Sequence, residues 1–316
     1  MENTKETVCE KISVVVPCYN EEEVLPIFYE KSSEAFSVIQ NVEIEYVFVN
    51  DGSKDKTLSI LKELEEKDER VHYVSFSRNF GKEAAMFAGM KETTGDYVAI
   101  MDADLQDPPE LLESMYKSIK EEGFDCVATR RVDRKGEPPI RSMFARMFYA
   151  IMHIIAKVDM VPGARDYRLM TRTMTDAILS LNEYNRFSKG IFGWVGFDTK
   201  WIPFENRKRA AGKTKWSFFS LFKYSIEGIV AFSTAPLVWS SILGLFFCLL
   251  AFVAVIFLFI RAIIFGDPVS GWPSLACMIT FFAGLQLFCS GIIGMYIAKS
   301  YLEIKGRPIY IVKEKK

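Results

Sequence analysis

The stretch YVAIMDAD occupies residues 97–104. Its first five residues are a continuous apolar run, and two aspartates, Asp102 and Asp104, follow at once. A short apolar run of this kind is typical of a strand buried on both faces, as in the parallel sheets of α/β proteins. We therefore predict a strand over residues 97–101 that delivers Asp102 to its carboxyl end.

Three further apolar runs upstream have the same character, and helical patterns separate them. The predicted strands are residues 12–16, 44–49 and 71–76. The predicted helices between the four strands are residues 21–37, 57–66 and 82–91. Strands that alternate with helices predict an α/β fold with a mainly parallel sheet.

A polar cluster follows each of the four predicted strands. The clusters are residues 19–21, 50–52, 77–79 and 102–104. Ligands of such sheets bind beyond the carboxyl ends of the strands, so we expect a site where the four clusters meet. Neither the dinucleotide-binding glycine fingerprint nor a P-loop accompanies the first strand, so a nucleotide must be held by other means.

The acidic cluster after the fourth predicted strand suggests that a metal ion helps to hold the nucleotide. Asp102, Asp104, Gln106 and Asp107 offer hard oxygen ligands that suit Mg²⁺ or Mn²⁺ bound jointly with substrate phosphates. The alternative is a solvated turn before a helix, because Asp107 opens an Asp-Pro-Pro-Glu sequence that also favours helix initiation.

Other single residues leave two interpretations open. Asp51 and Gly52 suit a ribose or a base edge, but they are equally typical of an ordinary strand-to-helix turn. His72 and His153 have apolar sequence neighbours and no metal-binding spacing, so we expect both to be structural.

Composition excludes several classes of protein. The 316 residues are half hydrophobic and one quarter charged, and the formal net charge of −1 gives no general argument for nucleic-acid binding. The six cysteines lack paired spacing, which argues against a disulfide framework. The polar, charged N-terminus predicts no signal peptide.

Two stretches, residues 237–260 and 272–298, contain no charged residue. Each is long enough to cross a bilayer, so they predict a transmembrane helical hairpin. Lysines and arginines flank the outer ends of the pair, and the positive-inside rule then predicts that both termini and the soluble domain are cytoplasmic. We therefore divide the chain into a catalytic domain (1–215), a juxtamembrane amphipathic helix (216–235), the hairpin (236–298) and a tail (299–316).

Basic residues gather in two groups before the hairpin. They are Arg130, Arg131, Arg134 and Arg141, and then Arg207, Arg209, Lys213 and Lys215. Such groups suit phosphate oxygens, and they equally suit adhesion to anionic lipid head groups. The aromatic segments 142–157 and 216–230 are expected to lie on the membrane surface, with core helices as the alternative.

Several motifs in order resemble the family 2 glycosyltransferases, and more narrowly the polyprenyl-phosphate glycosyltransferases. They are VVVPCYNE (14–21), VNDGS (49–53), RNFGK (78–82) and DADLQDP (102–108). Later motifs resemble the bactoprenol glucosyltransferases of O-antigen modification: DYRLM (166–170), KGIFGWVG (189–196), RAAGKTKW (209–216), FSTAPL (232–237) and the tail around Arg307-Pro308. The resemblance spans the chain, but Arg165 stands where the family pattern leads us to expect glycine.

The resemblance implies a GT-A fold, a UDP-sugar donor, a divalent metal ion and a polyprenyl phosphate acceptor in the cell (inner) membrane. It implies that uridine and ribose contact Pro17, Tyr19, Glu21 and Asp51, with Lys82 and Asp102 completing the nucleotide-sugar site. It places the metal on Asp104 and Gln106, and acceptor or donor phosphates on Arg131, Arg209 and Lys215. Asp166 lies near the transferring sugar and is expected, with Asp104 and Arg131, to be catalytic.

Glucose is the sugar that the nearest resemblance favours, with N-acetylglucosamine, galactose and mannose as alternatives. A processive polysaccharide synthase needs more spans and a Gln-x-x-Arg-Trp motif that this sequence lacks. A non-catalytic nucleotide-binding adaptor would have no need of the Asp102, Asp104 and Gln106 set. Relatives also suggest a homo-oligomer, with a tetramer expected, although no heptad seam in the sequence supports it independently.

Overall fold

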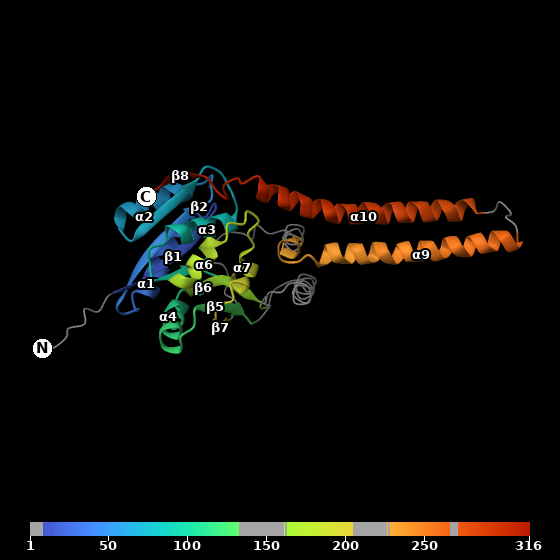
Figure 1. Ribbon diagram of the computed structural model, residues 1–316. Coiled ribbons are helices and arrows are strands. Elements are labelled where there is room, and N and C mark those ends of the chain that lie inside the picture. The colour runs from blue at the N-terminus through green and yellow to red at the C-terminus, as the bar shows by residue number, and fades with distance from the viewer. Residues whose placement is uncertain (1–8, 133–160, 162, 205–225, 227, 266–270) are drawn as a thin grey trace.

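The computed structural model describes residues 9–132, 161, 163–204, 226, 228–265 and 271–316. These residues form an α/β domain from which a pair of long helices projects, with the two helices lying side by side (Figure 1). The predicted interfacial segment 142–157 and most of the predicted juxtamembrane helix lie outside the described residues.

The four predicted strands form the centre of the sheet. They are β1 (Glu10–Cys18), β2 (Val42–Asn50), β3 (Val71–Phe76) and β4 (Tyr97–Ile100). They lie in the order β4-β1-β2-β3 and all pair in parallel, as the alternating pattern predicts. Val14, Val15 and Val16 are all fully buried, so β1 contacts the core on both faces and the unbroken apolar run is explained.

Helices connect these strands and cover both faces of the sheet. They are α1 (Leu25–Phe36), α2 (Thr57–Lys67), α3 (Lys82–Glu92) and α4 (Leu111–Glu122). Residues 84–90 of α3 are all buried. A Cβ atom at Gly89 would lie 2.2 Å from Cγ1 of Val15, so glycine is what allows α3 to lie this close to β1.

The second half of the domain adds strands of mixed direction. Its elements are β5 (Cys126–Arg131), β6 (Ala164–Thr171), α6 (Arg172–Ser180), α7 (Ser188–Trp194) and β7 (Thr199–Phe204). The sheet order is β7-β5-β6-β4-β1-β2-β3-β8, and β6 runs antiparallel to both of its neighbours, β4 and β5. Four of the seven pairings are parallel, so the predicted α/β class with a mainly parallel sheet is confirmed.

The two predicted apolar spans are helices, and both are longer than the uncharged stretches. They are α9 (Ala235–Phe265) and α10 (Trp272–Ile304), and both are long and apolar enough to cross a membrane by length and composition. The ring of Phe247 lies 5.8 Å from that of Phe281 and 5.6 Å from that of Phe282, which joins the two helices. Large apolar side chains along both helices are exposed, with Leu287 at 74%.

The segment after α10 returns to the sheet, which the sequence analysis did not predict. Strand β8 (Val312–Lys315) pairs antiparallel with β3 and covers its open edge. The Tyr310 ring stacks on Phe76 with centroids 4.9 Å apart, and Lys315 forms an ion pair with Glu92 at 2.9 Å. The predicted separate tail therefore completes the α/β domain.

Replacing Tyr310 by alanine tests this attachment. We expect Tyr310→Ala to destabilise the α/β domain by about 1–2 kcal/mol, because it removes a half-buried ring from the cluster around Phe76. The measurement is thermal unfolding of the full chain in detergent. Ile311→Ala is the matched control, since Ile311 is 52% exposed and its backbone carbonyl keeps its bond to the Ser77 N–H. Equal melting temperatures for the two variants would contradict the expectation.

Candidate active site

The loops after β1 and β2 are hydrogen-bonded to each other at the carboxyl edge of the sheet. The Asn20 N–H donates to Oγ of Ser53 at 2.9 Å, and the Glu21 N–H donates to Oγ1 of Thr57 at 2.9 Å. The clusters containing Pro17, Tyr19 and Glu21 on one side and Asp51 on the other therefore meet, as the position of the strand ends predicts.

Asp51 joins the end of β2 to the loop after β3. Asp51 is only 3% exposed. Its carboxylate accepts hydrogen bonds from the N–H groups of Phe80 at 2.6 Å and Gly81 at 2.9 Å. Burial raises the pKa of Asp51, and these two amide hydrogen bonds oppose that rise.

Gly52 allows the same two loops to touch. Its φ is +62°, a left-handed backbone conformation, and a Cβ atom there would lie 2.3 Å from the carbonyl carbon of Arg78. Any side chain would clash with that backbone, so the glycine of the VNDGS motif is a steric requirement of the site.

Lys82 lies between two carboxylates. Its ammonium group is 2.7 Å from Oδ1 of Asp102 and makes a short hydrogen bond to Oδ2 of Asp166. The side chains are 37%, 24% and 17% exposed for Lys82, Asp102 and Asp166 respectively, so the group is partly open to a ligand. The structure thus brings together three residues that the sequence analysis assigned to the donor sugar.

The direction of β6 explains how Asp166 reaches this position. Ile100 at the end of β4 pairs with Arg168 of β6, and β6 runs antiparallel to β4. The first residues of β6 therefore lie at the edge where β4 ends, so Asp166 faces the loop that contains Asp102. Lys82 reaches both because it is the first residue of α3.

The charges within this group stabilise one another. Burial alone would raise the pKa of Asp166, but the positive charges of Lys82 and Lys189 outweigh burial and hold that pKa below its usual range. Burial likewise opposes the charge on Lys82, and the carboxylates of Asp102 and Asp166 outweigh it and raise the pKa of Lys82. Asp166 therefore stays ionised at neutral pH.

The acidic turn after β4 is held in place by Arg165. The guanidinium donates from Nε to Oδ1 of Asp107 at 3.0 Å, and its Nη2 lies 3.5 Å from Oε1 of Gln106. Asp107 is 1% exposed, and burial raises its pKa to about 6 although the charge of Arg165 opposes the rise. The sequence analysis did not predict this pairing. The sign of it in the sequence is the arginine at position 165, where glycine was expected.

Asp104 and Gln106 lie in this turn. The Gln106 N–H donates to Oδ1 of Asp104 at 3.1 Å, and Leu105 between them has a φ of +55°. Carboxylate and carboxamide oxygens are suitable ligands for Mg²⁺ or Mn²⁺, and two protein ligands leave room for substrate phosphates and water. Among the described residues, His, Cys, Asp and Glu side chains form no cluster of three or more that would hold a metal ion.

Helix α7 packs beside the site, and the sequence analysis did not predict its contacts. Oε2 of Glu83, the residue after Lys82, accepts hydrogen bonds from the N–H (3.0 Å) and the hydroxyl of Ser188 at the start of α7. Arg168 is 2% exposed, and its guanidinium carbon lies 3.5 Å from the ring centroid of Phe192. These contacts fix α7 against α3 and β6.

The predicted phosphate-binding residues are described only in part. Arg131 ends β5, and its N–H donates to the Gly163 carbonyl at 2.9 Å, close to the start of β6. It therefore lies at the same edge of the sheet as Asp166. Arg209 and Lys215 lie outside the described residues.

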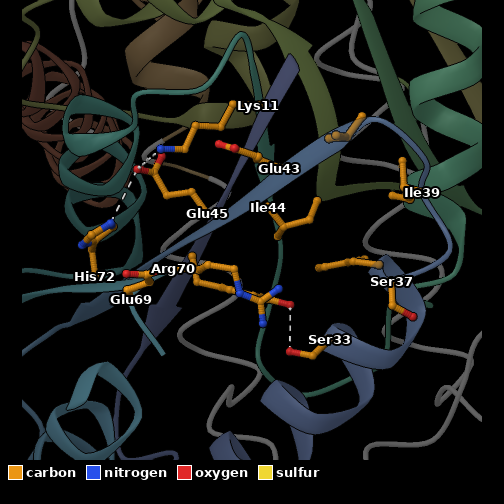
Figure 2. A pocket seen from close by; sticks show the side chains of 13 residues that line it. Lys11, Ser33, Ser37, Ile39, Glu43, Ile44, Glu45, Glu69, Arg70 and His72 are labelled. Carbon is orange, nitrogen blue, oxygen red and sulfur yellow. Dashed lines mark hydrogen bonds and ion pairs between the residues drawn. The ribbon is translucent and has the colours of Figure 1, made fainter. Parts of the chain in front are cut away.

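A cavity of about 520 Å³ opens at the opposite edge of the sheet, at the start of β1, β2 and β3 (Figure 2). Three of its polar side chains lie close together: Glu45 is 3.2 Å from Lys11 and 3.8 Å from His72. His72 has apolar neighbours in the sequence, but its own side chain is 45% exposed and faces this carboxylate. The cavity is remote from the strand ends that carry Asp102 and Asp166, so it is not the site described above.

Comparison with known proteins agrees with this geometry. The sequence model of glycosyl transferase family 2 matches residues 13–179, which run from within β1 to within α6 and include every described residue of the site except those of α7. The bactoprenol glucosyl transferase of Shigella phage SfX is 42% identical over 307 residues, covering 97% of this chain and 100% of that protein. The prophage bactoprenol glucosyl transferase homolog of Escherichia coli (strain K12) is 41% identical, covering 97% and 99%.

A solved structure is also similar. It is glucosyl-3-phosphoglycerate synthase from Mycobacterium tuberculosis in complex with Mn²⁺, UDP-glucose and phosphoglyceric acid, at 19% identity and a TM-score of 0.45, covering 70% of this chain and 78% of that chain. Since the family match spans more than half of the chain and the two relatives match nearly all of it, this protein belongs to glycosyl transferase family 2.

Proposed function

We propose that this glycosyltransferase moves glucose from UDP-glucose to undecaprenyl phosphate. The observation that carries the proposal is the junction between the site and the apolar hairpin. Glu303 near the end of α10 accepts hydrogen bonds from the loop directly before α7, and α7 contacts the site through Ser188. A lipid-borne acceptor beside α10 is therefore close to the transferring sugar. Near full-length similarity to proteins named bactoprenol glucosyl transferase supports the same substrates.

On the donor side, uridine and ribose occupy the joined loops of Pro17, Tyr19, Glu21 and Asp51. The sugar extends toward Asp102, where Lys82 offers a positive charge. This assignment follows the strand ends of β1, β2 and β4, which lie next to one another in the sheet.

Asp104 and Gln106 are the residues that would hold Mg²⁺ or Mn²⁺, and their oxygens suit either ion. When bound, such an ion supplies positive charge for the diphosphate that leaves with uridine. Arg131, Arg209 and Lys215 supply further positive charge for the phosphates of donor or acceptor.

The transfer is a single displacement. A phosphate oxygen of the acceptor forms a bond to the anomeric carbon as the bond to the β-phosphate oxygen of the donor breaks, and UDP leaves with the electron pair. The acceptor phosphate is already largely ionised at neutral pH, since its second pKa is about 6, so the reaction needs little general-base help. An α-linked donor gives a β-linked product. The ionised Asp166 stabilises the sugar as positive charge develops on it.

In this proposal α9 and α10 cross the inner membrane as a hairpin, with the catalytic domain and both termini in the cytoplasm. The hairpin holds the site at the head-group plane, where an isoprenoid phosphate is presented. A homo-oligomer, with a tetramer expected, remains a prediction.

A labelling experiment tests donor and acceptor together. Purified protein in detergent is incubated with undecaprenyl phosphate and, separately, with radiolabelled UDP-glucose, UDP-N-acetylglucosamine, UDP-galactose and GDP-mannose. We expect label in the lipid fraction with UDP-glucose and a β-linked product. Labelled lipid only with another donor would overturn the choice of sugar, and no labelled lipid with any donor would overturn the proposed reaction.

Metal removal tests the role of Asp104 and Gln106. We expect EDTA to lower transfer by more than about tenfold, because the charge on the leaving diphosphate is then less well compensated, and Mg²⁺ or Mn²⁺ to restore it. Asp104→Asn should raise the Mn²⁺ concentration that stabilises the UDP-bound protein in thermal unfolding. Asp176→Asn is the control, since the Asp176 side chain is 62% exposed on α6. An unchanged Mn²⁺ response in Asp104→Asn would remove this residue from the metal site.

Replacing Asp166 by asparagine removes its charge while keeping its shape. We expect kcat to fall by about 10²–10³-fold, because the ionised carboxylate stabilises charge that develops during transfer. The donor KM should change much less, since uridine and ribose bind at other loops. Asp176→Asn again controls for the substitution itself, and near-normal turnover in Asp166→Asn would rule out an essential charge at this position.

A further inference from the structure

The domain-proximal end of α10 holds the loop that precedes α7. One carboxylate, that of Glu303, accepts from the N–H of Tyr184 at 2.9 Å and from the N–H and side-chain amide of Asn185, both at 3.0 Å. One helical turn earlier, the Lys299 ammonium donates to Oδ1 of Asn185 at 2.9 Å. The loop is therefore attached to a helix more than one hundred residues further along the chain.

The attached loop continues directly into α7, which contacts the residue next to Lys82. Ser188 binds Glu83 through its N–H and its hydroxyl, and Glu83 follows Lys82 in α3. Lys189 is the next residue, and its positive charge acts on Asp166. Two residues thus separate the anchored Asn185 from Ser188, whose contact with Glu83 holds the first turn of α3.

The loop and α7 are packed so that they move together. The guanidinium carbon of Arg186 lies 4.2 Å from the ring centroid of Phe87 in α3, and Arg186 also donates to the Leu181 carbonyl at 2.6 Å. A Cβ atom at Gly190 would lie 2.5 Å from the ring of Phe232, so α7 packs tightly against the segment that leads into α9. The segment between Asn185 and Ser188 is therefore packed on both sides, which leaves little room for one to shift without the other.

We propose that Glu303 is a positioning residue for the transfer reaction: by anchoring Tyr184 and Asn185 to α10, it sets α7 and through it the Lys82–Asp166 pair. The position of α10 and the positions of the reacting groups are then coupled. This inference rests on the proposed function for its kinetic consequence, whereas the structural coupling that it asserts is measurable without any substrate.

The surface position of Glu303 makes it suitable for a clean test. The residue is exposed, so Glu303→Ala leaves no cavity in a core and the fold is retained. The neighbouring Ile304 is 85% exposed, and Ile304→Ala serves as the matched control at the same helix end. Glu303→Gln is the conservative variant, because it keeps one oxygen that accepts from the loop.

Hydrogen–deuterium exchange of the full chain in detergent is the first measurement. In Glu303→Ala we expect amides of residues 184–194 and of the first turn of α3 to exchange about tenfold faster than in Ile304→Ala, because their local opening becomes easier. Exchange confined to residues 184–186, or unchanged throughout, would overturn the coupling.

Transfer kinetics are the second measurement. We expect Glu303→Ala to lower kcat by about tenfold with a donor KM within about twofold of the parent, since misplacement affects the reacting groups and not the uridine loops. Glu303→Gln should recover part of the loss. An unchanged kcat, or parallel changes in kcat, donor KM and melting temperature, would overturn the positioning role. If the parent protein transfers no sugar, the proposed reaction fails, and the exchange experiment alone decides the coupling.

Discussion

Two carboxylates, Asp102 and Asp166, approach the same ammonium group, and like charges so close would repel without it. The contact joins the end of β4, the start of β6 and the first residue of α3, so three distant segments must meet for it to form. It is possible only because β6 runs antiparallel to β4, which brings the start of one strand to the end of the other. The other loops of the site are arranged around this charge group, and Asp51 and Gly52 hold the loop that leads into Lys82.

The four central strands and the position of the site could be predicted from the sequence. Apolar, β-branched runs are a local signal of buried strands. Parallel strands place their carboxyl ends at one edge of the sheet, so the clusters at Asp51 and Asp102 are expected to lie close together. The position of Asp166 came only from family resemblance, because no local pattern reveals that β6 reverses direction. Partners distant along the chain were missed for the same reason: Arg165 binds Asp107 across 58 residues, and Glu303 binds Asn185 across 118.

Helix α3 is linked to the chain that follows α9 in two ways, one indirect and one direct. On one side, Glu303 holds the loop that leads to Ser188 and Glu83. On the other, Tyr310 lies against Phe87, and Lys315 pairs with Glu92 at the far end of α3. The helix that begins with Lys82 is therefore fixed at both ends by elements attached to α10. Besides the covalent connection, noncovalent contacts therefore link α10 and the segment after it to the α/β domain.

The position of β8 in the chain also governs how this protein is made. Among the described residues, the strand that pairs with the outer edge of β3 is β8, which is synthesised after both α9 and α10. Until β8 is synthesised, the β3 edge of the sheet therefore lacks its partner strand, and an unpaired strand edge is prone to pairing with other chains. The sheet is therefore completed only after both long apolar helices have been synthesised. A polypeptide interrupted before β8 therefore lacks the strand that pairs with β3, and this edge of the sheet stays open to other chains.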